Sequence, residues 1–98
     1  MSFVFTFTPT GAGMSSRKYD ECISKLTAAG AANPKGRIYH VCYGDADNLS
    51  VTDVWDTVEN FQKFGAVLMP ILEEMGIDVG QPRVQAVYNI IEAPAYAG

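Results

Sequence analysis

The chain has 98 residues, of which 48% are apolar and 18% are charged, and its formal net charge is −4. This length supports a single domain over residues 1–98, and the composition is that of an ordinary globular protein. Its 7 basic residues are scattered and outnumbered by 11 acidic ones, so we expect neither nucleic acid nor a membrane surface as a partner.

Residues 3–8 alternate aromatic with small or β-branched side chains, which predicts a strand that ends in a turn at residues 9–11. This segment lacks the features of a secretory signal, and we therefore expect a cytoplasmic protein. Next, Ser15 or Ser16 can cap a helix that ends near Gly30 and has one apolar face. That face consists of Tyr19, Cys22, Ile23 and Leu26.

Two further β-rich runs cover residues 37–43 and 49–55. The Gly, Asp and Asn residues between them are typical of a turn, so the two runs predict a β-hairpin. Near the end of the chain, residues 84–91 predict a fourth strand, and residues 92–98 predict a tail.

A second helix is expected to begin at Asp56 or Thr57 and to end at Gly76. Pro70 lies inside this segment and cannot donate a helical hydrogen bond, so we expect a kink or a break near Met69. The apolar positions with helical spacing are Phe61, Phe64, Val67, Leu68, Ile71 and Leu72.

The element order βαββαβ predicts a ferredoxin-like α+β fold, with a four-stranded antiparallel sheet and two helices on one face. All four strands carry apolar residues on both faces, whereas a solvated face would alternate apolar with charged residues. Exposing a large apolar side chain forgoes roughly 1.5 to 3 kcal/mol. We therefore expect the uncovered face to be buried against a second copy, in a C2 homodimer.

His40 is the only histidine of the chain. If the hairpin loop spans residues 45–48, His40 lies opposite Asp53. The same register sets Ile38 opposite Trp55, on the same face. In one interpretation Asp53 orients His40, which acts as a base toward a phenol, enol or lactone. In the other, the two residues form a structural cross-strand pair.

The aromatic residues favour either a ligand pocket between sheet and helices or an ordinary core. The candidates for contact with an apolar ligand are Trp55, Tyr19, Phe61, Phe64 and Met69. Cys22 and Cys42 show no disulfide or metal spacing, and we expect buried free thiols. No nucleotide-binding or metal-binding motif is present in the sequence, so we expect neither a metal nor a cofactor.

The chain resembles the dimeric α/β-barrel superfamily, to which the antibiotic-biosynthesis-type monooxygenases belong. The resemblance follows the element order and centres on residues 51–61, where a strand ends in Trp55 and a polar cap leads to Phe61. It implies a dimeric α/β barrel, with cofactor-independent oxygenation of aromatic compounds among its activities. The quinone-forming oxygenases have an Asn where this chain has Val51, and the haem-degrading members have a His on the second helix, which is absent here.

Together these features predict a small homodimer that binds an apolar or aromatic metabolite, with His40 as base, Asp53 as its orienting partner and Trp55 as a pocket wall. Cofactor-independent monooxygenation and proton-transfer isomerisation are the candidate reactions. A binding or assembly module without catalysis is the alternative.

Overall fold

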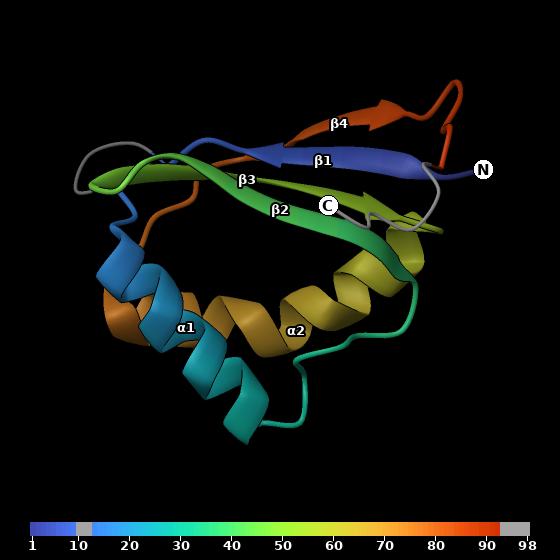
Figure 1. Cartoon of the computed structure of the whole chain (residues 1–98). Coiled ribbons are helices and arrows are strands. Elements are labelled where there is room, and N and C mark those ends of the chain that lie inside the picture. Colours follow the sequence, from blue (N-terminus) through green and yellow to red (C-terminus); the bar gives the residue numbers. More distant parts are fainter. Residues whose placement is uncertain (10–12, 93–98) are drawn as a thin grey trace.

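The computed structural model describes residues 1–9 and 13–92, which form a layer of strands against a layer of helices (Figure 1). The elements are β1 (Phe3–Phe7), α1 (Ser16–Ala28), β2 (Arg37–Asp45), β3 (Asn48–Trp55), α2 (Val58–Met75) and β4 (Arg83–Ala86). Parts of the predicted turn at residues 9–11 and of the predicted tail lie outside the described residues. Among the described residues, no helix is long and apolar enough to cross a membrane.

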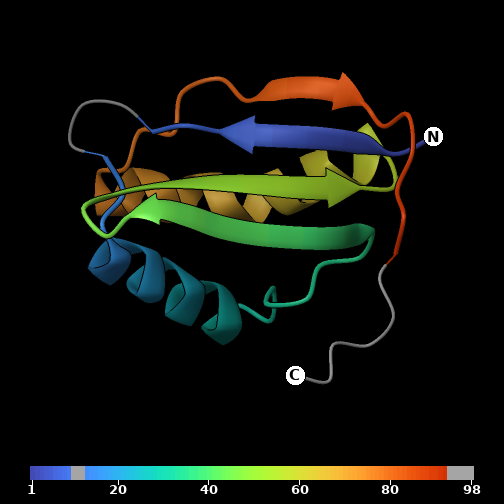
Figure 2. The same cartoon turned by 45° about the horizontal axis from the view of Figure 1, so that its top comes forward.

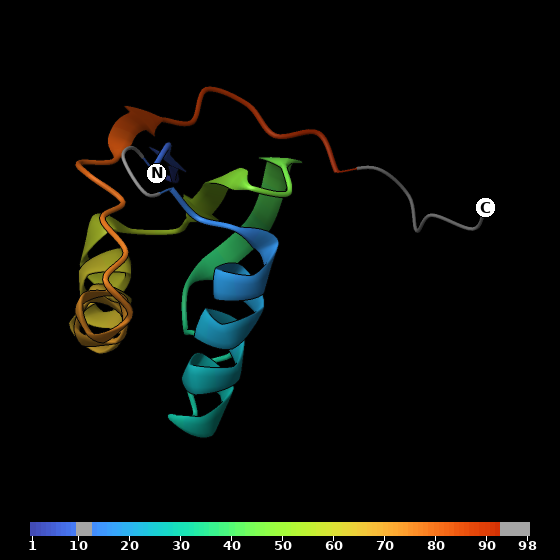
Figure 3. The same cartoon turned by 90° about the vertical axis from the view of Figure 1, so that its left-hand side faces the viewer.

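The four strands form one antiparallel sheet with the order β2-β3-β1-β4. Both helices lie on the same face of this sheet, α1 below β2 and α2 below the β1 side (Figures 1 and 3). The predicted ferredoxin-like α+β fold is therefore confirmed. We call the face covered by the helices the inner face and the opposite one the outer face.

Short polar side chains begin both helices, as the sequence predicts. The Ser15 hydroxyl accepts the backbone N–H of Lys18 at 3.2 Å, and the Thr57 hydroxyl accepts that of Asn60 at 3.0 Å. These bonds satisfy N–H groups that have no partner inside the first turn. At the other end of α2, Gly76 adopts a left-handed conformation that ends the helix.

α2 runs without a break through Pro70 to Met75, so of the predicted kink or break near Met69 the break is wrong. Its axis curves along the sheet in Figure 1. Packing on both sides of the proline holds the helix in place, because Phe64 and Leu72 are both buried. The missing N–H of Pro70 therefore does not end the element.

The core lies on the inner face. Phe5 and Trp55 are the most buried large side chains, at 1% and 0% exposure. Phe61 of α2 stacks on Phe5 with ring centroids 4.0 Å apart. Leu26 of α1 and Leu72 of α2 complete the contact of the helix layer with this cluster.

The hairpin of β2 and β3 has the predicted register where His40 pairs with Asp53. Toward the start of β2 the register shifts, and Arg37 rather than Ile38 pairs with Trp55. The prediction that Ile38 faces Trp55 is therefore wrong, because the shift inserts one residue into β2. As a consequence Arg37 belongs to the inner face, whereas Ile38 is 49% exposed.

β4 is shorter than predicted and ends at Ala86 instead of Ile91. Its neighbour β1 begins at Phe3, which pairs with Ala86, so no strand remains beside the residues that follow. One more backbone bond joins the N–H of Val87 to the carbonyl of Ser2 at 2.9 Å. The chain then leaves the sheet on the side away from the helices (Figure 3).

The outer face has no cover from the described residues (Figures 1 and 3). Tyr39 and Tyr43 of β2 are 58% and 44% exposed on it. On this face, which is turned toward the viewer in Figure 2, strand pairing places Val4, Thr6, Tyr39, Val41, Tyr43, Ser50, Thr52, Val54, Arg83 and Gln85. The outer face is therefore mostly apolar along β2, from Tyr39 to Tyr43, and polar along β4, where Arg83 and Gln85 lie.

Gly36 should be the glycine least tolerant of substitution. Its φ is +91°, and a Cβ added there would meet the Asp56 carboxylate and the Asn60 amide. Gly36→Ala combines backbone strain with this clash, and we expect it to lower the free energy of unfolding by about 3 kcal/mol. Chemical denaturation measures the change.

Gly30→Ala is the matched control, because Gly30 also has a positive φ, of +75°, but no atom within 4 Å of the added Cβ. In Gly30→Ala, backbone strain alone should lower the free energy of unfolding by about 1 kcal/mol. Equal losses in the two variants would show that the contact with Asp56 and Asn60 does not constrain the start of β2.

Candidate active site

A buried carboxylate lies at the centre of the inner face. Asp53 is 4% exposed, yet both of its oxygens are hydrogen-bonded. Nδ1 of His40 lies 2.5 Å from Oδ1, and the indole N–H of Trp55 donates to Oδ2 at 3.3 Å. β3 places Asp53 and Trp55 on one face because they are two residues apart, and the hairpin register adds His40. A carboxylate can be buried here because every partner it needs is supplied.

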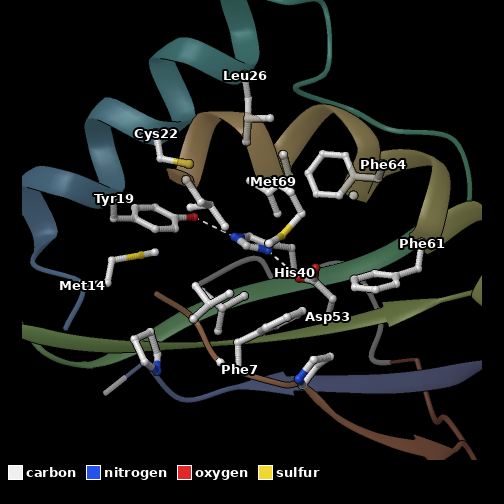
Figure 4. Close-up of a pocket in the computed structure, with 18 of the residues that line it drawn as sticks. Phe7, Met14, Tyr19, Cys22, Leu26, His40, Asp53, Phe61, Phe64 and Met69 are labelled. Carbon is white, nitrogen blue, oxygen red and sulfur yellow. Dashed lines mark hydrogen bonds and ion pairs between the residues drawn. The ribbon is translucent and has the colours of Figure 1, made fainter. Parts of the chain in front are cut away.

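α1 brings a fourth residue to this network (Figure 4). The Tyr19 hydroxyl lies 2.6 Å from Nε2 of His40, and the two rings are stacked with centroids 6.0 Å apart. Burial raises the pKa of Tyr19 above its ordinary value, so the side chain is a neutral phenol near pH 7. Because carboxylate oxygens only accept, the contact with Asp53 requires a hydrogen on Nδ1 of His40, and an imidazole in that tautomer can accept a hydrogen bond from the Tyr19 hydroxyl at Nε2.

A pocket of about 310 Å³ lies between α1, α2 and the inner face (Figure 4). Its volume is at the lower end of the range of small-molecule sites. His40 and Asp53 both line it, as do four of the predicted ligand contacts, which are Tyr19, Phe61, Phe64 and Met69. The polar groups of this network therefore face a cavity whose walls are otherwise mostly apolar.

Trp55 occupies a different place from the one expected. It is fully buried and is not among the described residues that line the pocket. Its ring lies against Phe61 and Phe64, at centroid distances of 5.7 and 5.4 Å. A hydrogen bond from its indole N–H to Asp53 connects it to the site. Trp55 therefore lies behind the carboxylate and not at the pocket wall.

Several lining residues are absent from the sequence-based candidates, and two of them, Arg37 and Gly65, bear on the chemistry and size of the pocket. Arg37 reaches the pocket only because of the register shift in β2, which the sequence pattern does not reveal. Gly65 lies one helical turn from Phe61, and a Cβ added to it would meet no atom within 4 Å. A glycine inside an amphipathic helix was the available signal, because glycine there is unfavourable without a local reason.

The cysteines do not form part of the hydrogen-bonded network. Both are free; Cys22 is buried and lines the pocket, while Cys42 is only half-buried, contrary to the prediction. Burial raises the pKa of both thiols, which disfavours the reactive thiolate.

No protein-family model matches the chain, and no curated protein matches it. Solved structures, in contrast, share its fold along almost its full length. SnoaB from Streptomyces nogalater, a cofactor-independent oxygenase, is 19% identical with a TM-score of 0.58, and the match covers 94% of this chain and 96% of that one.

Two candidate antibiotic biosynthesis monooxygenases are also similar. The protein from Chloroflexus aurantiacus is 15% identical with a TM-score of 0.56, over 93% of this chain and 95% of its own. The protein from Caulobacter crescentus is 14% identical with a TM-score of 0.53, over 92% and 89%. The chain therefore has the fold of the antibiotic-biosynthesis-monooxygenase-like proteins, which confirms the structural part of the resemblance.

The raised pKa of Tyr19 gives a direct test of the network. In an alkaline titration followed by tyrosinate absorbance, the transition that Tyr19→Phe removes should lie above pH 10.0, the ordinary value. Because the folded pKa exceeds the unfolded one, the stability linked to this proton is complete below that pH and is lost as pH rises further. Wild type should thus lose stability relative to Tyr19→Phe above pH 10.0. If the transition that disappears in Tyr19→Phe lies at or below pH 10.0, the pKa of Tyr19 is not raised and the prediction is wrong.

Proposed function

We propose that the chain binds an aromatic hydroxyl compound in this pocket and removes its proton through Tyr19, His40 and Asp53. The observation that carries the proposal is the continuous chain of contacts from the Tyr19 hydroxyl to Nε2 of His40 and from Nδ1 to the Asp53 carboxylate. The Tyr19 oxygen keeps a lone pair that can accept the ligand hydroxyl. As the ligand proton reaches Tyr19, the Tyr19 proton passes to His40, and Asp53 stabilises the resulting imidazolium.

The reaction that follows is cofactor-independent oxygenation. The phenolate transfers one electron to dioxygen, and the two radicals combine to form a carbon–oxygen bond in a peroxide. Protonation of the peroxide, cleavage of its O–O bond and loss of the proton on the same carbon release water and leave a quinone. One dioxygen is consumed and one water is formed for each quinone. The fold shared with SnoaB, a cofactor-independent oxygenase, supports this choice.

His40→Asn tests the base. The Asn amide can still donate an N–H to Asp53, so the buried carboxylate keeps a partner, but the acceptor nitrogen Nε2 is removed. Wild type should consume dioxygen in the presence of naphthol, and His40→Asn should lower kcat by about a hundredfold with little change in Tm. An oxygen electrode and a thermal melt measure the two quantities. If wild type and His40→Asn consume dioxygen at the same rate, His40 is not the base.

Gly65 provides the control for the pocket. Gly65→Ala adds a methyl group with room around it and should keep turnover while stabilising α2 by up to about 1 kcal/mol. Gly65→Leu fills the cavity and should raise KM for naphthol. If both variants behave alike, the ligand does not occupy this pocket. If wild type binds naphthol but takes up no dioxygen, the non-catalytic binding module is the correct interpretation.

We further propose that two chains pair through their outer faces in a C2 homodimer. The support is the exposed, largely apolar surface around Tyr39 and Tyr43, for which the described residues offer no cover. A patch of this kind is typical of an interface, and an isologous contact would bury it on both copies at once.

Light scattering at low micromolar concentration should report twice the mass of the chain. Tyr39→Glu places a charge in the apolar part of the outer face and should shift the protein to the monomer. Gln62→Glu makes the same charge change on the exposed side of α2 and should leave the dimer intact. A monomeric wild type overturns the proposal.

A further inference from the structure

Arg37 is the one basic residue among the described residues that line the pocket. The register shift sets it opposite Trp55, on the same face of β2 as His40. Its guanidinium carbon lies 5.6 Å from the centre of the Phe64 ring, and one of its nitrogens donates to the carbonyl of Ala32 at 3.0 Å. These two contacts hold the guanidinium beside the cavity and leave most of its N–H groups for another partner.

The charge of Arg37 has no match within the described part of the chain. The ion pairs found there are Lys25–Glu74, His40–Asp53 and Lys63–Glu59, none of which includes it. Asp53 is the only acidic residue among the described lining residues, and both of its oxygens are already engaged by His40 and Trp55. Arg37 is half-buried, so an unpaired cation at the edge of a mostly apolar cavity favours an anionic group on the ligand.

We propose, building on the function inferred above, that Arg37 is an anion subsite and that the ligand is an aromatic acid bearing a carboxylate as well as its reactive hydroxyl. The planar guanidinium fork matches a carboxylate with two parallel hydrogen bonds. Arg37 and His40 pair with Trp55 and Asp53, which are two residues apart along β3, so their side chains leave β2 roughly 7 Å apart. The Tyr19 hydroxyl, which would receive the ligand hydroxyl, lies at the His40 end of this span. A two-ring acid with its hydroxyl and carboxylate on opposite rings spans a distance of this order.

The test is calorimetric titration with such a hydroxynaphthoate and with its methyl ester. The acid and its methyl ester share the ring system and the hydroxyl, but only the acid carries a negative charge. Wild type should bind the acid roughly tenfold more tightly than the ester, a difference of about 1.4 kcal/mol. Arg37→Gln should remove this preference while changing the affinity for the ester by less than about twofold.

Arg17→Gln is the matched control, because it makes the same charge change on the exposed surface of α1 and should keep the preference for the acid. Wild type that binds acid and ester equally overturns the anion subsite and leaves the pocket in place. Loss of affinity for both compounds in Arg37→Gln also overturns it, because Arg37 would then act on the shape of the pocket. If neither compound binds wild type, the proposed function fails as well. Should Arg37→Gln not fold, the comparison of acid and ester on wild type decides the question alone.

Discussion

The burial of the Asp53 carboxylate is the constraint on which the site depends. At 4% exposure this group needs hydrogen-bond donors for both oxygens, and the imidazole of His40 and the indole of Trp55 supply them. Meeting this need fixes the orientation of the imidazole and turns its second nitrogen toward α1. The hydroxyl of Tyr19 can then bond to it, so one buried charge aligns a chain of groups that ends at a cavity.

The two helices, α1 and α2, contribute differently to the core and to the pocket. α2 closes the core, since Phe61 and Phe64 pack against the Trp55 ring that supports the carboxylate. α1 contributes Tyr19 from the opposite side, and the cavity remains between the helices because Gly65 has no side chain to fill it. Phe61 and Phe64 therefore belong to both the core and the pocket wall.

The sheet divides its apolar residues between two faces with different surroundings. The inner face is covered by helices of its own chain, whereas residues 1–9 and 13–92 leave the outer face open. This asymmetry follows from right-handed crossovers, which put both helices on one side. The site is built on the covered face from β2, β3 and α1, and the proposed contact between copies uses the opposite face.

The sequence by itself determined the local features: helix starts within one residue of Ser15 and Thr57, the order of the elements, and, for a hairpin loop at residues 45–48, the pairing of His40 with Asp53. Each depends on residues close together in the chain or on the period of a strand. Only the tertiary structure decided that Tyr19 reaches His40, that a shift in β2 turns a basic residue into the pocket, and that the fourth strand stops early. These depend on how elements meet in space, where a single inserted residue or the end of a neighbouring strand changes which side chains come together.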